Sequence, residues 1–187
     1  MKKLVILFIV LAAMISCKKN SDLVQTLNLP KLMNAAITQV FLETDNAKKK
    51  IMYQALSEKE RYQLWNSKFS ELITDQKLNS KQRSFIVNLK NILSVELFTK
   101  GSNAQKDFDG QGIKTKAIEL FGIEVAFDIV GAIGTSPSNR APGGWTTDCG
   151  CSRRSDWCWN NCIYSACNES GAGCGTLGLY SCVGTCS

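Results

Sequence analysis

Nine cysteines divide this chain of 187 residues into one isolated residue and one dense cluster. Cys17 follows an apolar N-terminal run, and no other cysteine precedes position 149. The remaining eight are Cys149, Cys151, Cys158, Cys162, Cys167, Cys174, Cys182 and Cys186. An even number of closely spaced cysteines in an exported chain predicts a disulfide framework. The spacing leaves the pairing open, but it disfavours a bridge between Cys149 and Cys151, because a one-residue gap strains the bond.

The first residues carry the three parts of an export signal. Lysines at positions 2 and 3 precede an apolar run over residues 4–15, and the small Ser16 stands before Cys17. The run is shorter than the roughly 20 residues that span a bilayer. The pattern resembles a bacterial lipoprotein signal, which implies cleavage before Cys17, lipid on its sulfur and membrane anchoring in the cell envelope, at the outer membrane in particular. The alternative is an ordinary signal peptide with an incidental cysteine.

The chain contains no histidine, and this excludes several classes of enzyme. Ser–His and Cys–His nucleophiles, histidine bases and most catalytic zinc sites all need that side chain. Oxidised cysteines would supply no thiolate, and their spacing lacks the paired knuckles of zinc modules, so an all-cysteine metal site is the weaker alternative. We therefore expect a protein that is not an enzyme, with no cofactor and no metal.

Charge gives a second exclusion. Loss of residues 1–16, which contain two lysines, would leave 171 residues and lower the net charge from +6 to +4. The lysines are scattered and no aromatic side chains are interleaved with them, so no nucleic acid partner is expected. The mild basic excess fits an anionic membrane surface or a solubilising face.

Residues 30–133 have the apolar periodicity of a small helical bundle, and residues 17–29 read as a polar tether before it. Two sequences match the capping box that starts a helix, in which the side chains of the first and fourth residues bond to each other's backbone N–H groups. They are Ser57-Glu-Lys-Glu60 and Asn79-Ser-Lys-Gln82.

The second half of the chain changes character twice. Glycine and polar residues over 101–112 predict a flexible loop, followed by a last helix over about 114–133. Residues 134–144 read as a linker and contain two of the three prolines. Residues 145–187 contain eight cysteines, six of fourteen glycines and three of four tryptophans. The expected fold class is mainly α, a small helical bundle followed by a disulfide-rich, loop-dominated C-terminal module.

Four short sequences of this module resemble one known family. They are Cys149-Gly-Cys151, Ser155-Asp-Trp-Cys158, Gly173-Cys-Gly175 and Tyr180-Ser-Cys-Val-Gly184. Together with the count of eight cysteines, they resemble the fulvocin C-related bacteriocins over about residues 145–187. The resemblance implies a membrane-active antibacterial tail on a longer precursor.

The aromatic residues of the module are its candidate contact residues. Trp157, Trp159, Tyr164 and Tyr180 would suit a membrane interface or a partner if exposed on a rigid scaffold. The alternative is that these rings form the core of a module that has few other large apolar side chains.

Gly143-Gly144 precedes the module and allows two interpretations. Cleavage there would release the module to the exterior, whereas an uncleaved pair is simply part of the linker.

The expected function is that of a secreted or lipid-anchored, bacteriocin-like protein. Its membrane contact would be the lipid on Cys17, and its target would be the envelope or membrane of other bacteria. The alternative is a non-enzymatic envelope lipoprotein whose C-terminal module binds a protein or a glycan.

Overall fold

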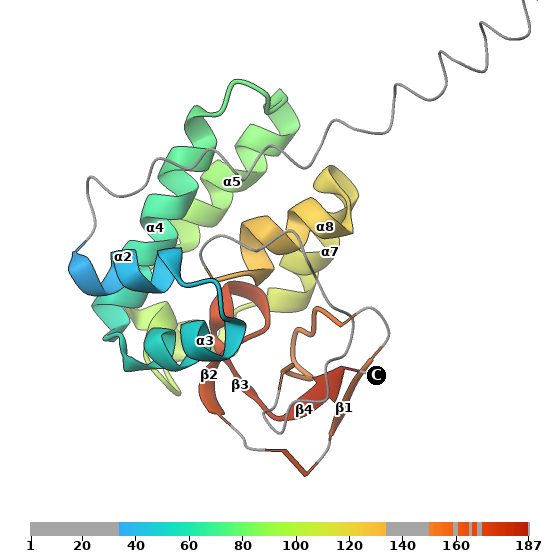
Figure 1. Cartoon of the computed structure of the whole chain (residues 1–187). Helices are drawn as coiled ribbons and strands as arrows, with labels where there is room; N and C mark the ends of the chain where they lie inside the picture. Colours follow the sequence, from blue (N-terminus) through green and yellow to red (C-terminus); the bar gives the residue numbers. More distant parts are fainter. Residues whose placement is uncertain (1–33, 134–149, 159–160, 165, 168–169, 187) are drawn as a thin grey trace, which may run out of the picture.

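A computed structural model describes residues 34–133, 150–158, 161–164, 166–167 and 170–186. Predictions about the signal, the tether and the linker, and about Cys17, Cys149 and Trp159, lie outside these residues. The described chain starts with a run of helices and ends with short strands (Figure 1). The expected fold class, a mainly helical chain with a disulfide-rich C-terminal module, is confirmed.

The helices follow one another with short connections. Their bounds are α2 Ala35–Leu42, α3 Asn46–Ala55, α4 Glu58–Thr74, α5 Ser80–Ile92, the 3-10 turn η3 Glu96–Phe98, α6 Asn103–Asp107, α7 Gly110–Phe121, α8 Ile123–Ala126 and the π-helical turn η4 Phe127–Gly131. The C-terminal elements are β1 Cys162–Tyr164, β2 Ser170–Cys174, the 3-10 turn η5 Thr176–Gly178, β3 Tyr180–Cys182 and β4 Gly184–Cys186.

Both predicted capping boxes form at the starts of α4 and α5. The Ser57 hydroxyl accepts from the Glu60 N–H at 3.3 Å, and the Glu60 carboxylate accepts from the Ser57 N–H at 2.9 Å. Asn79 starts α5 in the same way. Because each box satisfies backbone donors that the first helical turn leaves unpaired, a local sequence is enough to locate these two helix starts.

The structure corrects two expectations about the second half of the helical region. The expected flexible loop over 101–112 contains α6 and the start of α7, because Ser102 and Asp109 accept from backbone N–H groups three residues on. The expected single helix over 114–133 breaks at Gly122, whose φ of +77° ends α7. Its last part is the five-residue π turn η4.

The C-terminal segment forms two antiparallel pairs of short strands. Strand β1 pairs with β4, with Cys162 opposite Cys186 and Ile163 opposite Thr185. Strand β2 pairs with β3 through an irregular register. The segment expected to be loop-dominated therefore has a paired backbone, although no strand in the described part exceeds five residues.

A single hydrophobic core joins the helices to the C-terminal segment. Its helical members include Leu64, Trp65 and Phe69 of α4, all with no exposed surface. Leu177, Leu179 and Tyr180 belong to the same cluster and are at most 6% exposed. The C-terminal segment thus completes the helical core. Within the described residues, no helix is both long enough and apolar enough to cross a bilayer.

Candidate functional site

Three disulfide bonds define the C-terminal segment. They join Cys151 to Cys162, Cys158 to Cys186 and Cys174 to Cys182. Cys167 is disulfide-bonded as well. The prediction of a disulfide framework is therefore confirmed for these seven cysteines, and Cys151 is bonded to a later cysteine rather than to Cys149.

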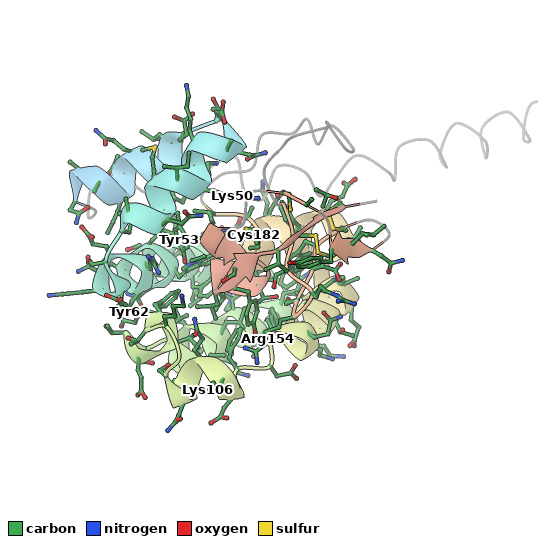
Figure 2. All side chains as sticks on the ribbon, turned by 90° about the horizontal axis from the view of Figure 1, so that it is seen from below. Lys50, Tyr53, Tyr62, Lys106, Arg154 and Cys182 are labelled. Atoms are coloured by element: carbon green, nitrogen blue, oxygen red, sulfur yellow. A yellow bond between two sulfur atoms is a disulfide. The ribbon has the colours of Figure 1, made fainter. Side chains whose placement is uncertain are left out.

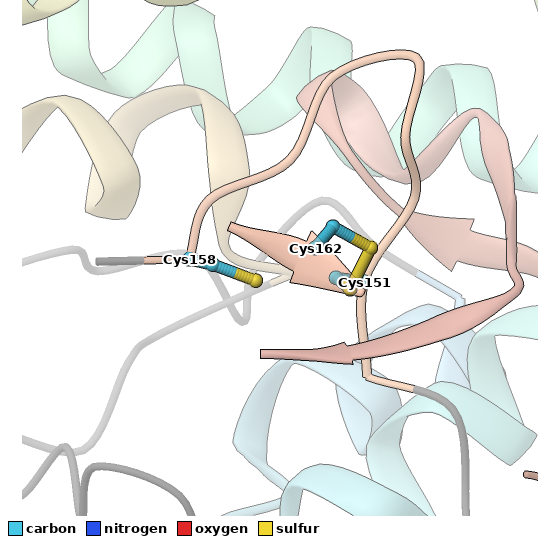
Figure 3. A group of neighbouring side chains, drawn as sticks. All are labelled: Cys151, Cys158 and Cys162. Atoms are coloured by element: carbon cyan, nitrogen blue, oxygen red, sulfur yellow. A yellow bond between two sulfur atoms is a disulfide. The ribbon is translucent and has the colours of Figure 1, made fainter. Parts of the chain in front are cut away.

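Two of these bridges lie side by side. The Sγ atoms of Cys151, Cys158 and Cys162 all lie within 4.8 Å of one another (Figure 3). Cys162 belongs to β1, and Cys151 is held against β4 by its backbone bridge to Gly184. Because all three sulfurs are in disulfides, they offer no thiolate to a metal ion in this oxidised state.

A first set of hydrogen bonds attaches the C-terminal segment to the helices. The Tyr53 hydroxyl donates to the Leu177 carbonyl at 3.0 Å and accepts from the Trp65 indole N–H at 3.1 Å. The Gln54 amide donates to the Ala172 carbonyl at 2.8 Å, so α3 contacts both β2 and η5. Figure 2 labels Tyr53 close to Cys182, and α3 contacts β2, the strand that pairs with β3. Burial strongly raises the pKa of Tyr53, which therefore stays a neutral donor.

A second set of hydrogen bonds, in which Ser155 and Thr176 are fully buried, lies at the start of α7. The hydroxyls of Ser155 and Thr176 are 2.6 Å apart, and they lie 3.3 Å and 2.8 Å from the Gly110 carbonyl oxygen. The Tyr180 hydroxyl donates to the Phe108 carbonyl at 3.2 Å. Sequence reasoning missed this contact, because Ser155 and Thr176 look like ordinary polar residues until the tertiary fold places them against α7.

The aromatic candidates divide between core and surface. Tyr180 is only 6% exposed, and Trp157 is half-buried in a T-shaped contact with Phe127, at a centroid distance of 5.6 Å. The expectation of a surface contact is therefore corrected for Tyr180, because its ring packs into the shared core. Tyr164 and its neighbour Ile163 are 64% and 50% exposed on β1. They are the large apolar side chains that the described C-terminal segment presents to solvent.

Sequence reasoning also missed a buried lysine. Lys68 of α4 has no exposed surface, and its ammonium donates to the Asp128 and Ala132 carbonyls at 2.6 and 2.8 Å. It lies 4.7 Å from the Trp65 ring centroid. Burial lowers the pKa of Lys68 to about 7, with a further lowering from Lys49 and an opposing effect from Asp128. Lys68 therefore supplies two hydrogen bonds to backbone carbonyls at the C-terminal end of η4.

The fold and the site together define a class, namely a mainly helical protein whose core is closed by a disulfide-bonded C-terminal segment. Comparison of the chain with protein-family models, with curated proteins and with solved structures found no match.

Proposed function

We propose that this chain is an exported, bacteriocin-like envelope protein without enzymatic activity, and that β1 is its contact with a bacterial membrane. The observation that carries the proposal is the exposure of Ile163 and Tyr164 on a strand held in place by disulfides. Apolar side chains on a fixed strand bind at a lower entropic cost than the same side chains on a mobile loop.

The chemistry around β1 suits an anionic membrane surface. Tyr164 has the amphipathic ring that favours the boundary between lipid headgroups and acyl chains. The loop closed by the Cys151–Cys162 bridge also contains Arg153 and Arg154, both exposed. Each basic residue near an anionic surface contributes about 1 kcal/mol of attraction.

The shared core favours action by the folded chain rather than by a released fragment. Release of the C-terminal segment after cleavage at Gly143-Gly144, outside the described residues, would separate Leu177, Leu179 and Tyr180 from the helices that bury them. Exposure of each such side chain costs about 1.5–3 kcal/mol. We therefore expect the intact mass of the native protein to correspond to an uncleaved chain, and a dominant C-terminal fragment would refute this part of the proposal.

The membrane contact is tested with vesicles of an anionic phospholipid. The protein carries Cys17→Ser, so that a lipid on Cys17 does not contribute to binding. Ile163→Glu should weaken vesicle binding about tenfold or more, since it replaces about 1.5–3 kcal/mol of apolar burial with a charge. Ile51→Glu is the matched control, because Ile51 is 65% exposed on α3.

The outcomes separate the two candidate functions. Equal losses for both variants, or none for either, would refute a specific contact by β1. If vesicles are not bound but an envelope protein or glycan is captured in a fixed ratio, and Ile163→Glu abolishes the capture, then β1 is the contact surface of a partner-binding lipoprotein instead.

A further inference from the structure

The Cys158–Cys186 disulfide joins one exposed cysteine to one buried cysteine. Cys186 is exposed at the end of β4, whereas its partner Cys158 is 6% exposed. Within 4.8 Å of the Cys158 sulfur lie both sulfurs of the Cys151–Cys162 bridge. A thiol from solution can therefore reach one end of this four-cysteine group, and the other end adjoins a second disulfide.

We propose that Cys186 is a site of thiol addition and that Cys158 transfers the resulting exchange to the Cys151–Cys162 bridge. A thiolate from solution attacks the Cys186 sulfur and forms a mixed disulfide there, and Cys158 leaves as a thiolate. The Cys158 thiolate attacks Cys151 or Cys162, forms a new bridge with it and releases the other sulfur, which takes a proton from water. Two disulfides are present before and after, so no oxidant is needed.

After the first step the backbone still holds the Cys151–Cys162 bridge against β4, and Cys158 stays next to Trp157, whose ring packs against Phe127. The N–H of Cys151 donates to the Gly184 carbonyl at 3.0 Å, and the Val183 N–H donates to the Cys151 carbonyl at 2.9 Å. These bonds do not depend on the Cys158–Cys186 bridge. Once that bridge is open, rotation of the Cys158 side chain between staggered positions can close the remaining distance to either sulfur.

The third bridge provides an internal contrast. Cys174 and Cys182 are 3% and 0% exposed, so a thiol from solution has no access to either sulfur. Among the described residues, neither belongs to a group of three neighbouring sulfurs. Of the three bridges described with both partners, Cys158–Cys186 is therefore the one that combines an exposed cysteine with a neighbouring disulfide.

The Cys186→Ser variant of the full chain tests the transfer step, because it leaves Cys158 without its partner. The protein is incubated near pH 8.5, where an ordinary cysteine is half ionised, for the minutes to hours that uncatalysed exchange requires. It is then quenched in acid, unfolded, alkylated and mapped by mass spectrometry. We expect alkylation at Cys151 or Cys162, increasing with incubation time. Alkylation confined to Cys158 at all times would overturn the proposal.

Cys174→Ser is the comparison variant, since its unpaired Cys182 lies outside the group of three neighbouring sulfurs and has the disulfide-bonded Cys167 packed beside it, so no label should reach Cys151 or Cys162. The wild-type chain tests the first step, with glutathione as the thiol. Glutathione should be found on Cys186, with alkylation at Cys151 or Cys162; glutathione on Cys174 or Cys182 instead would overturn the assignment of the site. The position of a thiol is measured independently of membrane binding, so this inference can fail or succeed without the proposed function.

Discussion

Replacement of Tyr53 by phenylalanine tests whether the C-terminal segment and the helices fold as one unit. The Tyr53 side chain has no exposed surface, and its hydroxyl joins Leu177 of the C-terminal segment to Trp65 of α4. Tyr53→Phe keeps the ring and removes only the oxygen atom. The variant therefore leaves a buried carbonyl and a buried indole N–H without their partner.

An unsatisfied buried polar group costs about 1–3 kcal/mol, so the free energy of unfolding should fall by about 2–6 kcal/mol for the two groups together. The measurement is urea unfolding under non-reducing conditions, followed by circular dichroism and by tryptophan fluorescence. Both signals should follow the same transition, because the helices and the C-terminal segment share one core.

Tyr62→Phe is the matched control, since Tyr62 is half-buried at the edge of the core and no hydrogen bond to its hydroxyl occurs among the described residues. Its effect should remain within about 0.5 kcal/mol. A Tyr53→Phe effect equally small would refute the argument that this hydroxyl attaches η5 to the helices. Two separate transitions in the wild-type chain would refute the shared core itself.

Two further variants test buried features of the core. Between about pH 7 and pH 10, the free energy of unfolding of the wild-type chain should rise relative to that of Lys68→Met, by at most about 1.4 kcal/mol per pH unit. The reason is that Lys68 has lost its proton in the folded chain in this range, whereas it retains the proton in the unfolded chain. Urea unfolding at several pH values measures this difference, and parallel curves for the two proteins would contradict it. Gly175→Ala should cost about 2–4 kcal/mol, since φ is +72° and the new Cβ would lie 2.8 Å from the Ser155 carbonyl oxygen. Gly101→Ala should cost only about 1–2 kcal/mol at a similar φ of +77°, because nothing lies within 4 Å of its Cβ, and equal losses of melting temperature would refute the clash at Gly175.

Local signals explain the parts of the fold that were predicted correctly. The starts of α4 and α5 depend on hydrogen bonds between residues three apart, so the capping residues Ser57 and Asn79 reveal them. The break at Gly122 was missed although glycine is a common helix terminator, because the apolar periodicity continues on both sides of it. The π turn η4 was missed because its carbonyls are capped by Lys68, which is 60 residues away from Asp128.

The cysteine pattern alone predicted that residues 145–187 would be covalently cross-linked, since a segment of this size with few large apolar residues needs such bonds. Only the tertiary structure decided that Leu177, Leu179 and Tyr180 would enter the helical core rather than form a core of their own. The physical reason is the distance along the chain. Tyr53 and Leu177 are 124 residues apart, and no local propensity or cysteine spacing encodes which buried donor meets which carbonyl across that separation. The same holds for the neighbouring sulfurs of Cys151, Cys158 and Cys162, whose proximity arises from strand pairing and not from their spacing.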